Sequence, residues 1–136
     1  MQMNRYVVDT SFLVSFFNNK DVNHLKALEF MSTMYHEYLI IPTVVIAELA
    51  SFRKNKKFRD LIIGNVFNIA SEICSLNEAN IFEYLSFREN FDINLRAMDS
   101  VILFSAVQGD AELLTFDEEL LKVYSKLQRQ RANTPS

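Results

Sequence analysis

Four carboxylates in this chain stand where a charged side chain is costly, because each one interrupts or follows a stretch of apolar residues. Asp9 divides the stretch YVVDTSFLVSFF at residues 6–17, and Asp117 follows AELLT. Glu48 has valines and a phenylalanine one helical turn away, and Asp99 has leucines and an isoleucine at the same spacing. Acids that face solvent rarely have such neighbours, so we expect these four to be functional.

Together these acids are suited to hold one or two divalent cations. Carboxylates brought close raise one another's pKa through repulsion and desolvation, so something cationic must neutralise them. The segments around Asp9 and Glu48 carry no Lys or Arg at a matching position, which favours Mg²⁺ or Mn²⁺ with oxygen ligands. Such an ion activates water and stabilises charge on a phosphodiester, so nucleic-acid hydrolysis is the expected reaction. Thr10, Ser11 and Thr115 adjoin two of the acids and are expected to orient them.

The composition indicates one domain. The chain has 136 residues, of which 49% are hydrophobic, and Cys74 is its single cysteine, which excludes an intramolecular disulfide and a multi-thiolate zinc site. No stretch reaches the roughly 18 apolar residues of a membrane span, and no N-terminal signal pattern is visible, so we expect a cytoplasmic protein that does not contact a membrane. The domain is expected to cover residues 1–128, with a polar, disordered tail at 129–136.

The net charge of −3 argues mildly against a general polyanion binder. If four of the 17 acids hold metal ions, however, 13 acids remain against 14 bases, and the rest of the surface carries +1. Five of the basic residues fall in RKNKKFR at 53–59, which is either a solvated helix end or an RNA contact. The candidate substrate contacts are Arg53, Lys54, Lys56, Lys57 and Arg96.

Strand-like and helix-like segments alternate along the chain. This order predicts βαβ units and therefore a three-layer α/β/α sandwich with a mostly parallel sheet of four or five strands. Thr43 and Asn77 are expected to cap helices. In open parallel sheets the functional crevice lies beyond the carboxyl ends of the strands, where Asp9 and Asp117 are expected to meet. The expected strands cover residues 5–9, 38–42, 71–76 and 111–115.

Four segments together resemble the PIN-domain nucleases and, in size and layout, the single-domain VapC-type toxins. They are VVDTS, PTVVIAELA, AMDSVILFSAV and LLTFDEEL, and their order over residues 5–120 is more specific than any one of them. The resemblance implies an endoribonuclease that uses Mg²⁺ or Mn²⁺ at Asp9, Glu48, Asp99 and Asp117 to cut single-stranded or exposed RNA. It also implies a homodimer that is silenced by an antitoxin protein in the active-site groove. In this family another strand often follows the last acid, whereas EELLKVYSKLQRQ looks helical.

Other interpretations stay open. Asp9 and Asp117 are also suited to cap helices, Glu48 to reach the surface or pair with the basic run, and Asp99 to form a local structural pair. A PIN-like module that binds RNA or a protein without catalysis is the second hypothesis, and a housekeeping RNA-processing nuclease is another. A phosphotransfer domain is disfavoured, because DTS at residues 9–11 lacks the second acid that such a site requires.

Overall fold

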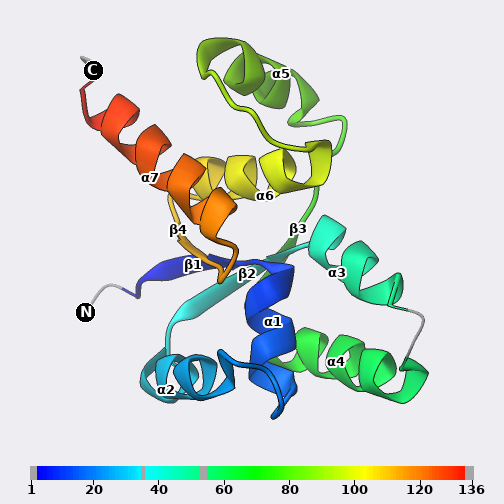
Figure 1. Cartoon of the computed structure of the whole chain (residues 1–136). Helices are drawn as coiled ribbons and strands as arrows, with labels where there is room; N and C mark the ends of the chain where they lie inside the picture. Colours follow the sequence, from blue (N-terminus) through cyan, green and yellow to red (C-terminus); the bar gives the residue numbers. More distant parts are fainter. Residues whose placement is uncertain (1–2, 35, 53–54, 134–136) are drawn as a thin grey trace.

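The computed structural model describes residues 3–34, 36–52 and 55–133, which form a parallel sheet between two layers of helices (Figure 1). Within the described residues the sheet has four strands in the order β3-β2-β1-β4. All three strand pairs are parallel, and Val7 at the centre of the sheet lies opposite Ile40 on one side and Leu113 on the other. The strands are β1 (Arg5–Val8), β2 (Tyr38–Pro42), β3 (Glu72–Cys74) and β4 (Glu112–Leu114).

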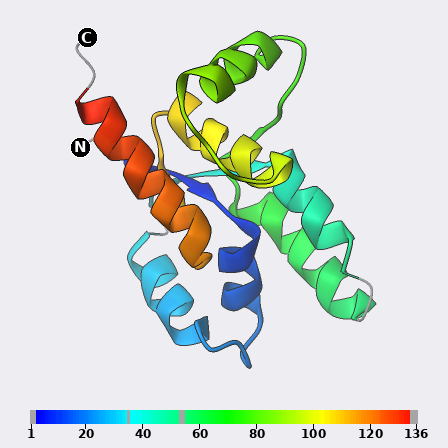
Figure 2. The same cartoon turned by 45° about the horizontal axis from the view of Figure 1, so that its top comes forward.

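Helices cover both faces of the sheet, which confirms the predicted three-layer α/β/α sandwich. Figures 1 and 2 show α1, α2 and α4 on one side of the strands and α5, α6 and α7 on the other, with α3 continuing from the end of β2. In the described part of the chain, no helix is long and apolar enough to cross a bilayer. The helices are α1 (Thr10–Phe17), α2 (His24–Met34), α3 (Thr43–Ala50), α4 (Lys56–Ile69), α5 (Ile81–Asn90), α6 (Ala97–Gln108) and α7 (Glu118–Ala132).

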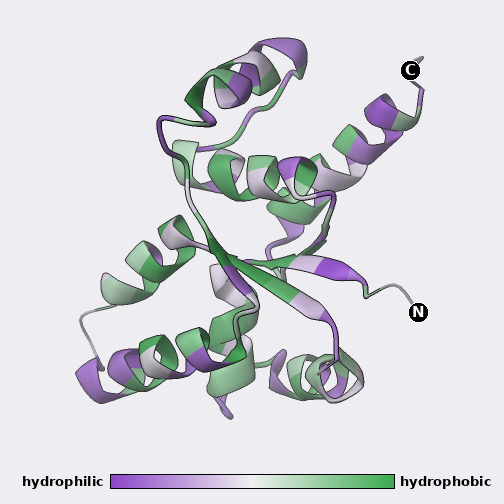
Figure 3. Ribbon diagram, turned by 180° about the vertical axis from the view of Figure 1, so that it is seen from behind, coloured by the Kyte–Doolittle hydropathy of each residue, from purple (hydrophilic) through white to green (hydrophobic). Residues whose placement is uncertain are grey.

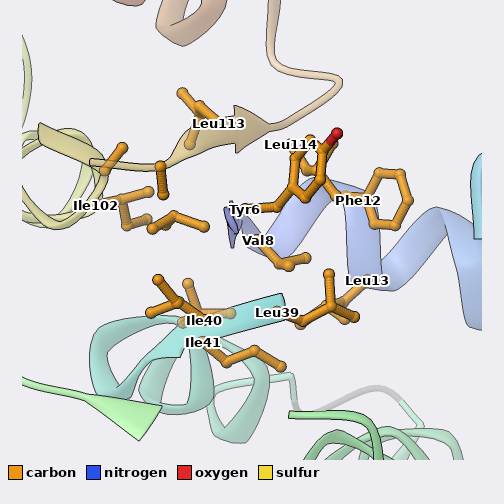
Figure 4. Close-up of a cluster of buried hydrophobic side chains, with 14 of the residues drawn as sticks. Tyr6, Val8, Phe12, Leu13, Leu39, Ile40, Ile41, Ile102, Leu113 and Leu114 are labelled. Carbon is orange, nitrogen blue, oxygen red and sulfur yellow. The ribbon is translucent and has the colours of Figure 1, made fainter. Parts of the chain in front are cut away.

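The core lies on both faces of β1 and β2. Helices pack on each side of these strands, so their residues are apolar almost without interruption and not at alternate positions. Figure 3 shows the hydrophobic colour running along the central strands, and Figure 4 shows apolar side chains from β1, β2, β4, α1 and α6 gathered together. Val7, Ile41 and Ile102 are fully buried in this cluster. This packing holds the ends of β1 and β4 in fixed positions.

Two predicted helix caps are wrong. Asn77 lies before a turn, and α5 begins at Ile81 with Asn80 in the N-cap position. The Asn77 side chain instead accepts a hydrogen bond from the Ala79 amide at 2.8 Å, so a local turn takes up the group that was expected to cap the helix. Thr43 is the first residue inside α3 and follows Pro42 in the N-cap position.

The C-terminal helix is longer than the sequence suggested. Residues 129–132 belong to α7 and not to the disordered tail expected from residue 129, while residues 134–136 lie outside the described residues. Arg129 and Arg131 fall in the last turn of α7, where cations interact favourably with the negative end of the helix dipole. In the described chain, helix α7 follows Asp117, at the point where a fifth strand had been considered.

The core position of Ile102 leads to a stability prediction. Ile102→Ala should lower the free energy of unfolding by about 2–5 kcal/mol, because it removes buried apolar atoms and leaves a cavity. Val22→Ala, at a side chain that is 92% exposed, is the control and should change it by less than about 0.5 kcal/mol. Urea titration followed by circular dichroism measures both, and a loss below about 1 kcal/mol for Ile102→Ala would contradict the packing described.

Candidate active site

The strand order brings two chain segments together at the carboxyl ends of β1 and β4. Strand β1 is paired with β2 on one side and with β4 on the other. The chain thus adds β2 and β3 on one side of β1 and then crosses over to add β4 on the other side. Ligand crevices of open parallel sheets form at such switch points, beyond the carboxyl ends of the strands. The Asp9 amide donates a hydrogen bond to the Leu114 carbonyl at 2.9 Å, so the end of β1 is tied directly to the end of β4.

An open pocket of about 470 Å³ lies beyond these strand ends, and all four acids singled out in the sequence line it. They come from four separate segments: the end of β1, helix α3, the first turn of α6, and the N-terminus of α7. The pocket therefore depends on the tertiary fold and not on a local motif. The four acids are Asp9, Glu48, Asp99 and Asp117.

Asp9 is a buried carboxylate, 5% exposed, that two hydroxyls hold in place. Its Oδ2 accepts hydrogen bonds from Ser11 Oγ at 2.8 Å and from Thr115 Oγ1 at 2.7 Å. Asp9 occupies the N-cap position of α1, yet its side chain accepts no capping bond from the described backbone of that helix. Helix capping therefore does not account for this side chain, which is held by the Ser11 and Thr115 hydroxyls.

Thr115 links Asp9 to Asp117. The Asp117 amide donates to Thr115 Oγ1 at 2.9 Å, while the Asp117 Oδ1 accepts from the amides of Glu119 and Leu120 at 3.0 and 3.1 Å. Asp117 thus caps α7, which the sequence had left open as its alternative role, and it lines the pocket as well. One residue serves both purposes, because a carboxylate has a second oxygen that these capping bonds do not use.

Glu48 lies on α3 between buried apolar neighbours and turns toward the same pocket. Thr10 Oγ1 donates to its Oε1 at 3.2 Å. Burial raises the pKa of Glu48, and the negative charges of Asp9 and Asp99 raise it further, against the lowering effects of the Thr10 hydrogen bond and Arg96. Glu48 is therefore close enough to both aspartates to be affected by their charges.

Asp99 pairs with an arginine from its own segment. Its Oδ2 accepts from Arg96 Nη2 at 3.2 Å and from Arg96 Nε at 3.3 Å, and Arg96 also lines the pocket. The neighbouring hydroxyl of Ser100 bonds elsewhere, to the Ala97 carbonyl and the Tyr84 hydroxyl. The local pair that the sequence left open is thus present, and one acid of the pocket has a cationic partner within the chain.

Sequence reasoning did not identify a polar loop that also lines the pocket. Asp21 and Asn23 of this loop contribute to the lining, together with Ser15 on α1. Asp21 Oδ1 accepts from Ser15 Oγ at 2.9 Å and from the Asn23 amide at 2.8 Å. The run NNKDVNH at 18–24 is rich in turn-forming residues, which predicts a loop but not where the loop folds. Phe52 and Phe116 complete the lining with aromatic rings.

The described part of the basic run does not line this pocket. Lys56 and Lys57 are exposed at the start of α4 and are not part of the described lining of the pocket. Arg53 and Lys54 lie outside the described residues. Of the candidate substrate contacts within the described chain, the structure brings only Arg96 to the pocket.

Comparison with protein-family models gives a match to the PIN domain over residues 6–126. The chain belongs to the PIN domain family. The comparison with curated proteins gives no match.

Solved structures share this PIN fold over most of their length. The VapC20 toxin of Mycobacterium tuberculosis, described as cleaving the sarcin-ricin loop, aligns at a TM-score of 0.66 and 14% identity over 86% of this chain and 93% of its own. VapBC2 from Rickettsia felis, solved with promoter DNA, gives 0.63 and 21% identity over 87% and 91% of the two chains. The structure of FitAcB from Neisseria gonorrhoeae gives a TM-score of 0.64 and 14% identity over 88% of this chain and 93% of its own. At these identities the likeness shows the fold.

The PIN pocket fits a divalent cation in its chemistry but not in the present arrangement of its side chains. Carboxylate and hydroxyl oxygens are the ligands that Mg²⁺ and Mn²⁺ take, and Glu48 is affected by the charges of two other acids. Among residues 3–34, 36–52 and 55–133, however, no three His, Cys, Asp or Glu side chains are placed so that they hold an ion as they stand. Cation binding in this pocket would therefore need some of these side chains to change position.

The raised pKa of Glu48 predicts how stability changes with pH in EDTA. Below the ordinary pKa of 4.5 this carboxyl is protonated in both folded and unfolded chains and carries no penalty. As the pH rises through its higher folded pKa, the folded chain must ionise a partly buried group beside other acids, and stability falls. Glu48→Gln should therefore gain stability relative to the parent chain as the pH rises above 4.5.

Urea titrations at several pH values measure this difference, with the exposed Glu29→Gln on α2 as the control for loss of one charge. A stability difference for Glu48→Gln that stays constant with pH would contradict the electrostatic environment described.

Proposed function

We propose that this PIN domain is an endoribonuclease that hydrolyses RNA phosphodiester bonds with Mg²⁺ or Mn²⁺. The observation that carries the proposal is the pocket at the switch point of the sheet, because four carboxylates from distant segments line it together. A cluster of acids at this position destabilises the folded chain unless a positive charge neutralises it. A divalent cation, which binds oxygen ligands, can supply that charge. The PIN fold, which is typical of nucleases, supports the same conclusion.

Each polar residue of the pocket has a place in this reaction. The four acids Asp9, Glu48, Asp99 and Asp117 would hold the cation. A divalent cation in such a site supplies water activation and charge stabilisation at the phosphate. The Ser11 and Thr115 hydroxyls fix one oxygen of Asp9, and the Thr10 hydroxyl fixes one oxygen of Glu48. These contacts reduce the freedom of the carboxylates before any ligand arrives.

The biological setting that we propose is a toxin of a toxin–antitoxin pair. The support is the fold shared with VapC20, described as a toxin that cleaves the sarcin-ricin loop, and with the VapBC2 and FitAB proteins. An antitoxin protein and a second copy of this chain are the proposed partners. Leu61 and Phe67 on α4 are 55% and 58% exposed, which makes them candidates for the surface between two copies.

The proposed RNA contacts are cationic. Arg96 lines the pocket itself, and Lys56 and Lys57 at the start of α4 would interact with phosphates farther along the strand. Arg53 and Lys54 remain candidates on their sequence position alone. Because α4 follows α3, which carries Glu48, a strand of RNA that reaches the pocket can pass near these lysines.

A second candidate function is supported by one observation. Because no three described metal-binding side chains are arranged to hold an ion as they stand, a PIN-like module that binds RNA or protein without cleaving it is the alternative. Titration calorimetry with Mn²⁺ separates the two, because a catalytic site binds the ion at near-neutral pH and an inactive module does not.

Cleavage of RNA should depend on the acids and on the ion. With Mg²⁺ or Mn²⁺ the protein should cut single-stranded RNA, and EDTA should abolish the activity. Asp9→Asn and Asp99→Asn should each reduce kcat by at least about 100-fold, because each removes a charged oxygen ligand.

Asp110→Asn is the matched control, since Asp110 lies at the opposite end of β4 with a φ of 49° that asparagine also tolerates. It should retain full activity. Robust cleavage by Asp9→Asn or by the protein in EDTA would overturn the proposed mechanism.

A further inference from the structure

Arg96 occupies an unusual position for a cation. It is the N-cap residue of α6 and ends the irregular segment at 92–96 that leads from α5 into the site. Its side chain is 86% exposed, whereas that of Asp99, its partner, is 14% exposed. The guanidinium therefore lies at the mouth of the pocket, with one acid behind it and solvent in front.

The helix itself does not favour this cation. The N-terminus of a helix carries partial positive charge, which stabilises acids such as Asp99 in the first turn and disfavours an arginine at the cap. Arg96 instead lies beside the acids of the pocket and pairs with one of them. Its effect reaches Glu48 as well, where it opposes the charges of the two aspartates.

The contact with Asp99 is also a weak one. Its N–O distances of 3.2 and 3.3 Å exceed the roughly 2.7–2.9 Å of strong charge-assisted hydrogen bonds. Both bonds end on the same oxygen, Oδ2, so this is not the parallel two-oxygen pairing that arginine forms at its strongest. Ion pairs with one partner this exposed contribute little to stability.

We propose that Arg96 is an exchangeable partner of Asp99 that controls entry to the site. It holds this carboxylate while the pocket is without its cation, gives it up when the cation binds, and then pairs with a phosphate of the RNA. The proposal rests on the proposed function and adds a regulated step to it.

Electrostatics gives the direction of the exchange. Once a divalent cation neutralises the acids, Arg96 is left beside two positive charges, the cation and the N-terminus of α6, and loses the attraction that held it. An RNA phosphate brought to the same pocket is then the nearest anion. A guanidinium suits that anion better than an ammonium does, because its planar fork can donate two parallel hydrogen bonds to phosphate oxygens.

The first test measures Mn²⁺ binding without RNA by titration calorimetry. Arg96→Gln should bind Mn²⁺ about two- to five-fold more tightly than the parent chain, because Asp99 no longer has to be released. Arg96→Lys should fall between the two, since lysine keeps the charge but loses the fork. Arg88→Gln removes an exposed arginine from α5, away from the pocket, and should leave the affinity unchanged.

The second test measures binding of a 2′-O-methyl RNA, which resists cleavage, at saturating Mn²⁺. Arg96→Gln should weaken this binding about three- to ten-fold and reduce the slope of log affinity against log salt by about 0.7, as expected when one phosphate contact to a single strand is lost. Arg88→Gln should again match the parent chain. Circular dichroism confirms that each variant is folded.

The outcomes separate this proposal from the proposed function. If the parent chain binds no Mn²⁺, both are overturned. If the parent binds Mn²⁺ and cleaves RNA but Arg96→Gln binds the ion equally or less tightly, only the role of Arg96 is overturned. The role of Arg96 is also overturned if Arg96→Lys binds Mn²⁺ like the parent while Arg96→Gln binds it more tightly, because charge alone then explains the effect. It is overturned as well if Arg96→Gln binds RNA as tightly as the parent.

Discussion

Negative charge concentrated at the carboxyl ends of β1 and β4 is the constraint on which this molecule depends. Asp9 is almost fully buried, and Glu48 is affected by the charges of both Asp9 and Asp99. Such a cluster opposes folding, because each carboxylate loses hydration and repels the others. The fold tolerates it because three helices direct their N-termini at the pocket: Asp9 and Asp117 occupy the N-cap positions of α1 and α7, and Asp99 lies in the first turn of α6.

The sheet positions the carboxylates of the pocket, and the surrounding polar residues orient them. Pairing of β1 with β4 brings Thr115 against Asp9, so a hydroxyl from one end of the chain holds a carboxylate from the other. The buried apolar strands make this geometry rigid, because they pack against helices on both faces. Compensation of the charge is left incomplete, since Arg96 is weakly held and exposed. A site of this kind allows the chain to fold and still carries uncompensated negative charge that a divalent cation can neutralise.

That the four acids lie in one pocket was predictable because apolar neighbours make a carboxylate conspicuous. The strands were predictable because buried parallel strands are continuous apolar runs. The contact of Ser11 with Asp9 was predictable from adjacency, whereas Thr10 and Thr115 donate to acids from distant segments, which adjacency does not predict. The loop containing Asp21 was not, because its residues predict a turn but not the surface on which the turn folds. The cap at Asn77 failed because an asparagine can bond its own turn as readily as a helix. The partner of Arg96 was undecided because acid and phosphate both suit a guanidinium.

The central claim is that the four acids form one cation site. The most direct measurement is anomalous scattering from a crystal of the protein grown with Mn²⁺, because it locates the ion without reference to activity. Manganese should appear in the pocket, within bonding distance of carboxylate oxygens from Asp9 and Asp99, with the Asp99 side chain turned away from its position in the metal-free chain. A well-ordered pocket without manganese at saturating Mn²⁺, or manganese bound only at other places on the surface, would contradict the account.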